Sequence, residues 1–166
     1  MLNVYQLAYA SQANVTQGEK GIDLEVGRIL LKSKNNNSKL NIGGVLYYAD
    51  GYFFQVLEGD KDAVCRLYEK LCKDERHSHV KILAEGFIDQ PMFSNWSMHF
   101  VPTVSSIRQL LRDYDLNRFT PFSFSVPLVK KLIEVLSLSG QYTPDKVAIK
   151  KPASGGIFGA IRRVFS

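Results

Sequence analysis

Alternating apolar and polar residues predict a set of short strands in this chain. Alternation places every second side chain on the same face of a strand. In the first stretch, Asn3 to Ala10, it puts Tyr5, Leu7 and Tyr9 on one face. The same pattern predicts further strands at residues 42–48, 52–57, 80–88 and 96–101. Asp50-Gly51, between the second and third of these, is a strong signal for a β-hairpin.

Apolar residues at helical spacing predict two helices among these strands. The first covers residues 21–34 and ends in Asn35-Asn36-Asn37, which suits a helix C-terminus because Asn tolerates left-handed backbone. The second begins at Gly59 or Asp60. Its apolar stripe, which we expect to lie in the core, comprises Val64, Leu67, Tyr68, Leu71 and Cys72.

The resulting order, β-α-β-β-α-β-β, predicts an α+β fold: a ferredoxin-like sandwich with helices on a mostly antiparallel sheet. Two extra C-terminal helices follow, at about residues 104–113 and from Pro127 onward. Residues 139–156 are rich in Gly, Ser, Pro and Lys, as linkers are. We therefore expect a folded domain at residues 1–101, a helical extension at 102–138, and a linker with a basic amphipathic tail at 139–166.

The charge of the chain is concentrated at its C-terminal end. The 166 residues carry a formal net charge of +5, but five basic residues and one acidic residue lie beyond residue 139. A nucleic-acid-binding domain would carry its basic surface on the folded body, so we expect no direct nucleic-acid partner. The N-terminus has no signal-peptide pattern and no apolar run approaches a membrane span. These features predict a cytoplasmic protein.

Gln55 and Tyr9 are the residues most indicative of chemistry. Gln is a poor strand former between Phe54 and Val56, and a buried amide needs several hydrogen bonds. Either Gln55 meets the polar edge of a ligand in the core, or it faces solvent on an open side of the sheet. Tyr9 is either a core tyrosine with a hydrogen-bonded hydroxyl or a hydrogen and electron donor. Tyr, Gln and Trp with no evident nucleophile suit a redox-active ring whose hydrogen bonds rearrange.

Other candidates also carry structural alternatives, and for the Asn residues the structural alternative is strong. Asn36-Asn37 can end a helix or match the amide-like edge of a flavin or pyrimidine ring. Trp96 and Met98 share a strand face, where they can form a sulfur–aromatic core contact or belong to a site. Asp74 and His77 lie in a polar segment that can hold ribityl or phosphate groups or be an ordinary exposed loop. His77 has no metal-type partners at suitable spacing, and we expect no metal site.

Several motifs occur together, in an order and spacing more specific than any one of them. They are Leu7-Ala8-Tyr9-Ala10-Ser11, Asn36-Asn37, Gly44-Val45-Leu46-Tyr47, Phe54-Gln55-Val56-Leu57-Glu58-Gly59, Asp74-Glu75-Arg76-His77 and Trp96-Ser97-Met98. Over roughly residues 1–101 this arrangement resembles the BLUF domain, a blue-light sensor that uses flavin. The chain also resembles the short BLUF proteins in which two helices follow the sensor and no catalytic domain is attached.

The resemblance implies a role for each candidate residue. Tyr9 would be the redox-active phenol, and Gln55 the amide between it and the flavin. Asn37, with Asn36 beside it, would bind the carbonyl and ring-NH edge of the flavin. The strand residues that exchange position near Gln55, or relay its change, would be Trp96 and Met98. The remaining cofactor contacts that it implies are Ile29, Leu71, Lys70, Asp74 and His77.

The resemblance also implies a function without enzymatic activity. Blue light would drive electron and proton transfer from Tyr9 to a noncovalently bound FAD, with FMN or riboflavin as alternatives, and the hydrogen bonds of Gln55 would rearrange. Signalling would run through an unidentified cytoplasmic signalling or transcription-regulating protein, and a homo-oligomer is compatible with it. The sequence departs from the family at Gly43, where Thr is common, and at Gln6, where Arg is usual.

Two rival functions share part of this pattern. An RNA-binding module of the RRM type shares the topology, but its third strand needs a basic residue before Gly, where this chain has Asp50. A small acylphosphatase-like hydrolase needs an anion-binding loop with Arg, and residues 11–14 contain none.

The apolar positions of the tail, from Ile157 to Phe165, follow a helical period. We expect the tail to dock on this protein or on a partner, and we do not expect it to bind a membrane surface.

Overall fold

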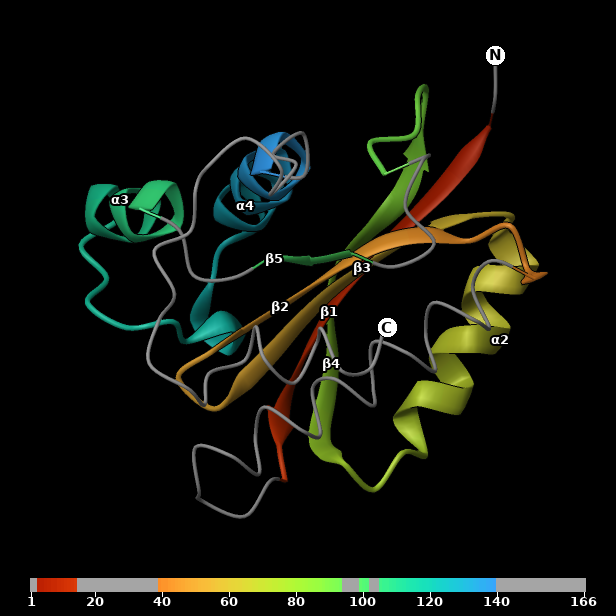
Figure 1. Ribbon diagram of the computed structural model, residues 1–166, viewed down its shortest axis with the longest axis horizontal. Helices are drawn as coiled ribbons and strands as arrows, with labels where there is room; N and C mark the ends of the chain where they lie inside the picture. Colours follow the sequence, from red (N-terminus) through yellow and green to blue (C-terminus); the bar gives the residue numbers. More distant parts are fainter. Residues whose placement is uncertain (1–2, 15–38, 94–98, 102–104, 140–166) are drawn as a thin grey trace, which may run out of the picture.

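The computed structural model describes residues 3–14, 39–93, 99–101 and 105–139 (Figure 1). The predicted helix at residues 21–34, the positions of Trp96 and Met98, and the tail lie outside these residues. The described elements, in chain order, are β1 (Val4–Ala13), β2 (Gly43–Ala49), β3 (Tyr52–Gly59), α2 (Lys61–Cys72), β4 (His77–Ile88), β5 (His99–Val101), α3 (Ser105–Asp113), the 3-10 helix η1 (Pro121–Ser123) and α4 (Val126–Ser139).

The strands form one sheet in the order β4-β1-β3-β2-β5. Pairing is antiparallel across β4, β1, β3 and β2, and β5 joins the edge parallel to β2. The central position of β1 and β3 is the ferredoxin-like arrangement, so the predicted α+β class is confirmed. β1 and β3 carry Tyr9 and Gln55, which places both residues in the middle of the sheet.

The hairpin between β2 and β3 forms as the Asp-Gly pair predicts. Asp50 has a φ of 51° and Gly51 a φ of 84°, so both central residues lie in the left-handed region. A turn of this kind matches the twist of the two strands that it joins. It fixes the register of β3, and therefore which of its residues face each side of the sheet.

Helix α2 begins where the sequence predicts, but the last residue of its predicted apolar stripe is not buried. The Asp60 carboxylate accepts a hydrogen bond of 3.0 Å from the Ala63 amide and caps the helix. Val64 and Leu67 are buried, whereas Cys72 is exposed, so the prediction of Cys72 as core is wrong. At about 100° per residue, Cys72 lies about 80° around the helix from Val64, at the edge of the apolar stripe.

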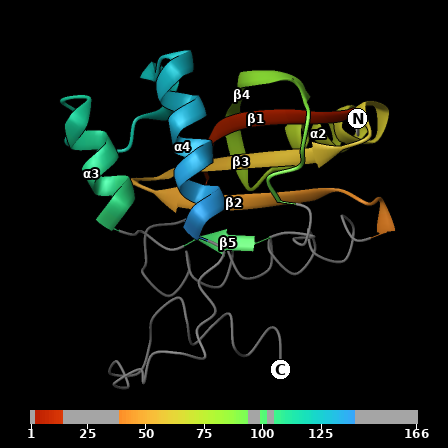
Figure 2. The same ribbon diagram turned by 90° about the horizontal axis from the view of Figure 1, so that it is seen from above.

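Helices cover both faces of the sheet (Figures 1 and 2). On one face, Tyr9, Phe53 and Leu57 pack with α2. On the other face, Phe54 and Val56 pack with α3 and α4 in a second, larger core. This separation confirms the predicted alternation of β3. None of the described helices is long and apolar enough to span a membrane.

Two strands are longer than the sequence predicts. β1 continues to Ala13 instead of ending at Ala10, and β4 begins at His77 instead of Val80. The two extensions pair with each other, with Ala13 opposite His77. Polar residues extend these strands because the neighbouring strand supplies hydrogen bonds that the local sequence pattern does not reveal.

Candidate functional site

Tyr9 and Gln55 lie opposite each other on β1 and β3, under helix α2. The Tyr9 hydroxyl donates a hydrogen bond to Oε1 of Gln55. Both residues are only 2 % exposed, which excludes the alternative of a solvent-facing Gln55. Burial raises the pKa of Tyr9, so its phenol keeps its proton at neutral pH and acts as the donor.

Aromatic rings surround the phenol of Tyr9. The Tyr68 ring lies edge-on with its centroid 5.4 Å from that of Tyr9, and the His77 ring lies 6.3 Å away. Burial, with a hydrogen bond to Cys72 adding to it, raises the pKa of Tyr68 to about 12. Tyr9 therefore sits among aromatic rings in an apolar layer, where a change in its charge is poorly screened.

His77 joins three elements around this pair. Its Nε2 lies 2.5 Å from the backbone oxygen of Leu71, which can only accept, so Nε2 carries the proton. Nδ1 lies 2.7 Å from the Ser11 hydroxyl, within hydrogen-bond distance. His77 thus connects β4 to the end of α2 and to β1, and each ring nitrogen has a partner within the protein.

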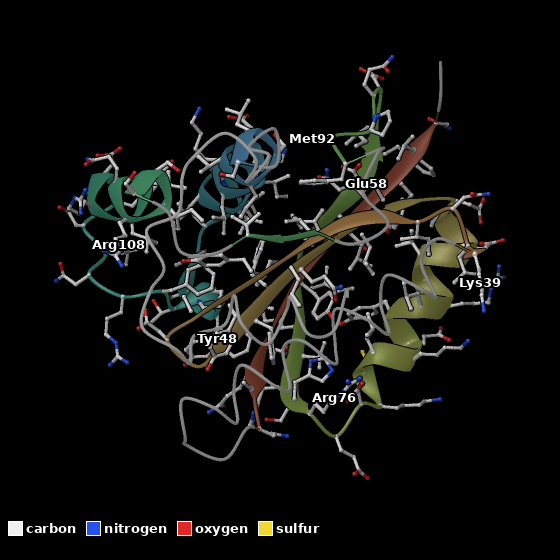
Figure 3. The ribbon with its side chains drawn as sticks, viewed as in Figure 1. Lys39, Tyr48, Glu58, Arg76, Met92 and Arg108 are labelled. Carbon is white, nitrogen blue, oxygen red and sulfur yellow. The ribbon has the colours of Figure 1, made fainter. Side chains whose placement is uncertain are left out.

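Asp74 and Lys70, which the sequence suggests as ligand contacts, lie near the C-terminal end of α2. The Asp74 carboxylate forms an ion pair with Arg76, which is labelled in Figure 3, and accepts the Arg76 backbone amide at 3.0 Å. The hydrogen bond from Arg76 lowers the pKa of Asp74 to about 2. Lys70 is exposed, and Leu71 is partly buried against the Tyr9 layer. The predicted roles of Ile29, Asn36, Asn37, Trp96 and Met98 concern residues outside the described part of the chain.

The sequence pattern does not single out two buried polar residues, Ser11 and Glu58. Ser11 is fully buried and Glu58 is 2 % exposed. Ser11 follows Tyr9 by two residues on the same strand, which is the signal that could have predicted its place in the site. Glu58 interrupts an apolar run in β3, and alternation places it on the face opposite Gln55.

The chemistry of the site suits the edge of a flat, polar ring. A phenol and a primary amide are hydrogen-bonded to each other in an apolar layer, and an amide can present either its oxygen or its nitrogen. A flavin ring has hydrogen-bond acceptors and a ring NH along one edge, and its flat faces suit apolar contacts. The described residues therefore fit a flavin. In this part of the chain no group of three or more His, Cys, Asp or Glu residues is placed to hold a metal ion.

Comparison with known sequences identifies relatives of this region. Residues 4–99 match the family BLUF, sensors of blue-light using FAD. The chain is 39% identical over 74 residues to photoactivated adenylate cyclase subunit beta of Euglena longa, and 31% identical over 93 residues to that of Euglena gracilis. These alignments cover 45% and 55% of this chain but only 8% and 10% of the cyclases.

Solved structures give similarity over most of the chain. The ground state of BlsA has a TM-score of 0.75 at 36% identity, and the alignment covers 87% of this chain and 95% of BlsA. The photo-activated state of BlsA gives a TM-score of 0.76 at 37% identity, covering 84% of this chain and 99% of BlsA. BlrB, a BLUF protein in its dark state, shares the fold with a TM-score of 0.67 at 23% identity.

These matches decide between the alternatives that the sequence left open. An RNA-binding module of the RRM type needs an open sheet face on which bases stack, whereas helices cover both faces of this sheet. The family match spans more than half of the chain and includes both Tyr9 and Gln55. The chain belongs to the BLUF family of blue-light sensors that use FAD.

Proposed function

We propose that this chain senses blue light by rearranging the hydrogen bond between Tyr9 and Gln55 beside a noncovalently bound flavin. The observation that carries the proposal is the buried phenol–amide pair itself. A buried glutamine in an apolar layer is retained only where its hydrogen bonds are satisfied. Its partner here is a phenol, which can give up both an electron and a proton.

When bound, the flavin supplies light absorption and a strongly oxidising excited state. The Tyr9 O–H bond points along an existing hydrogen bond to Oε1 of Gln55, so loss of an electron from the phenol allows its proton to move to that oxygen. When the electron and a proton return to Tyr9, Gln55 would be left rotated, or in a tautomeric form if the returning proton comes from its NH2 group. The amide then presents a donor where it had presented an acceptor, without any covalent bond to the cofactor.

We propose that the flavin is held between α2 and the predicted helix at residues 21–34. Asn37, with Asn36 beside it, would bind the polar edge of the ring, and Ile29 and Leu71 would pack on its faces. The existing partners of Asp74 and His77 support an indirect role, in which they order the end of α2 around Tyr9. Lys70 is exposed and remains free to reach a ribityl or phosphate group.

We further propose that the output is a protein–protein interaction and not an enzymatic reaction. The chain spans about a tenth of the cyclases that it matches, and cyclase activity is a property of those longer proteins. In this proposal residues 1–101 sense light, the helices within 102–138 receive the change, and 139–166 serve as linker and tail. Trp96 and Met98 would relay the change from Gln55 to a cytoplasmic partner.

The variants Tyr9→Phe and Gln55→Leu test this mechanism. Each should bind flavin but lose the long-lived red shift after blue light, because one partner of the phenol–amide pair is missing. Tyr5→Phe is the matched control: Tyr5 lies on the same strand and face, but its hydroxyl donates to Glu85 at 2.5 Å. Absorption spectra before and after illumination decide the matter, and a normal red shift in Tyr9→Phe or Gln55→Leu would refute the assigned roles.

A further inference from the structure

Glu58 forms a polar link on the sheet face opposite Gln55. Its Oε1 accepts a hydrogen bond of 2.7 Å from the side-chain amide of Gln6 on β1. Its Oε2 accepts two hydrogen bonds of 2.9 Å, from the backbone amides of Met92 and Phe93. Glu58 and Met92 lie at the same end of the sheet (Figure 3). One buried carboxylate thus joins β3, β1 and the segment Pro91–Phe93.

All three partners of Glu58 are hydrogen-bond donors, so the arrangement suits a carboxylate that only accepts. Burial raises the pKa of Glu58, and the hydrogen bonds from Gln6, Phe93 and Met92 oppose that rise. Among the described residues no Lys or Arg forms an ion pair with it. A buried charge that depends on neutral donors is sensitive to the loss of any one of them.

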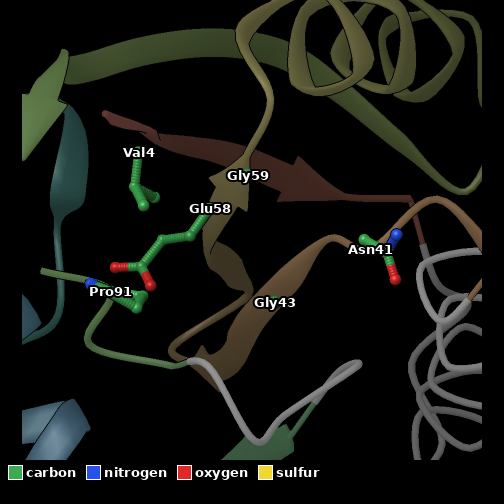
Figure 4. Close-up of a pocket in the computed structure, with 6 residues that line it drawn as sticks. All are labelled: Val4, Asn41, Gly43, Glu58, Gly59 and Pro91. Atoms are coloured by element: carbon green, nitrogen blue, oxygen red, sulfur yellow. The ribbon is translucent and has the colours of Figure 1, made fainter. Parts of the chain in front are cut away.

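The segment that Glu58 holds, Pro91–Phe93, comes between β4 and β5 in the chain. It follows β4, which pairs with β1, and it precedes residues 94–98 in the chain. Phe93 is 1 % exposed and packs in the core shared with α3 and α4. Beside the carboxylate, Gly43, Gly59 and Pro91 line a pocket, and Figure 4 shows Glu58 pointing from β3 toward Pro91. Glu58 also lines this pocket, so the pocket lies directly beside its hydrogen bonds.

We propose that Glu58 is a positioning residue of the photocycle: it fastens Pro91–Phe93 to the strand that carries Gln55, and this link sets the lifetime of the light-adapted state. The inference rests on the function proposed above. The link is formed in the arrangement in which Tyr9 donates to Gln55. Because Gln55 and Glu58 share β3, a shift of that strand on rearrangement changes both sets of hydrogen bonds. If the hydrogen bonds of Glu58 are stronger before illumination than after it, they favour the dark arrangement and so speed the return to it.

Three variants test the link. Glu58→Ala removes it, and Gln6→Glu places a second carboxylate against Glu58, which repels it. The exchange Gln6→Glu with Glu58→Gln restores it, because the amide oxygen at position 58 accepts from Met92 and Phe93 while its NH2 group donates to the new carboxylate. Glu85→Ala is the matched control, since this exposed carboxylate of β4 accepts from Tyr5 on the same sheet.

The decay of the red-shifted state is measured in each variant, together with hydrogen exchange at the Met92 and Phe93 amides in the dark. We expect both single variants to decay on the order of fivefold more slowly and to exchange these amides faster, with the double exchange and the control close to wild type. Amide exchange does not depend on the photocycle, so it reports separately on the link.

Each result has a defined meaning. Lifetimes equal to wild type in Glu58→Ala and Gln6→Glu, with a normal red shift, would overturn the inference and leave the proposed function intact, even if amide exchange changed. A wild-type protein without a red shift would remove the proposed function, and the inference with it. If Glu58→Ala does not fold, Gln6→Glu and the double exchange decide: a slow single variant that the exchange fails to restore would also contradict the link.

Discussion

At the scale of single residues, the site combines a neutral pair in an apolar layer with a charged pair at its margin. Tyr9 and Gln55 are buried and uncharged, so their hydrogen bond can rearrange without moving a charge through water. Asp74 and Arg76 form an ion pair at the end of α2, next to His77 in sequence. In the proposed mechanism the first pair responds to light, whereas the second responds to pH.

Asp74→Asn should make the protein less sensitive to acid. The pKa of Asp74 falls from an ordinary value of 3.8 to about 2 on folding, so the ion pair stabilises the native state above pH 4 and loses this effect as the pH falls toward 2. Urea unfolding of wild type and Asp74→Asn between pH 6 and 2 measures the difference. We expect wild type to be more stable at pH 6 and the two to converge near pH 2. A difference that does not change with pH would contradict the assignment.

The sequence predicts some of these residues better than others. Burial of Gln55 follows from its position in an alternating apolar strand, because the turn at Asp50-Gly51 fixes the register. Partner choice does not follow from spacing: the pairing of Asp74 with Arg76, and of His77 with Ser11, depends on where α2 ends and how β4 joins β1. The roles of the candidates toward flavin remain predictions.

At the scale of elements, the hairpin between β2 and β3 determines which face receives Gln55. Gly51→Ala should lower the free energy of unfolding by about 1–2 kcal/mol, because alanine is strained at a φ of 84°. Gly86→Ala is the matched control: a Cβ at Gly86 meets no atom within 4 Å, and its φ is not in the left-handed region. Chemical unfolding compares the two, and equal stability of both variants would show that the turn geometry is not required.

The described strands and α-helices were predictable from local pattern, but some of their ends and one pairing were not. The start of α2 after Asp60 and the Asp-Gly turn are encoded within a few residues, and both lie where the sequence predicts them. The extensions of β1 and β4 depend on each other across more than sixty residues of sequence. The parallel pairing of β5 with β2 is likewise a long-range contact that a periodic pattern does not specify.

At the scale of the whole molecule, Phe119 joins the sheet to the C-terminal helices. Its ring lies edge-on to Tyr47 and Phe54, with centroids 5.0 and 6.4 Å away, and its amide donates to the Asp50 carboxylate at 2.7 Å. Phe54 is adjacent to Gln55 in β3 but faces the opposite side of the sheet. Phe119 therefore contacts the back of the strand that carries Gln55.

Phe119→Ala should destabilise the protein without removing its red shift after blue light. We expect the free energy of unfolding to fall by about 3–5 kcal/mol, as for other buried phenylalanines. The red shift should remain, because Phe119 packs on the face opposite Tyr9. Phe87→Ala is the control, since this ring is 55 % exposed and its loss should cost less than about 1 kcal/mol. Loss of the red shift in a folded Phe119→Ala protein would contradict the separation of the two faces.

The absorption spectrum of the purified protein, in the dark and after blue light, tests the central claim most directly. The account predicts the spectrum of oxidised flavin, released by denaturation because it is not covalently bound. It also predicts a small shift to the red on illumination without bleaching, and return of the original spectrum in the dark. A colourless protein that fails to take up added flavin, or a bound flavin that bleaches without shifting, would contradict it.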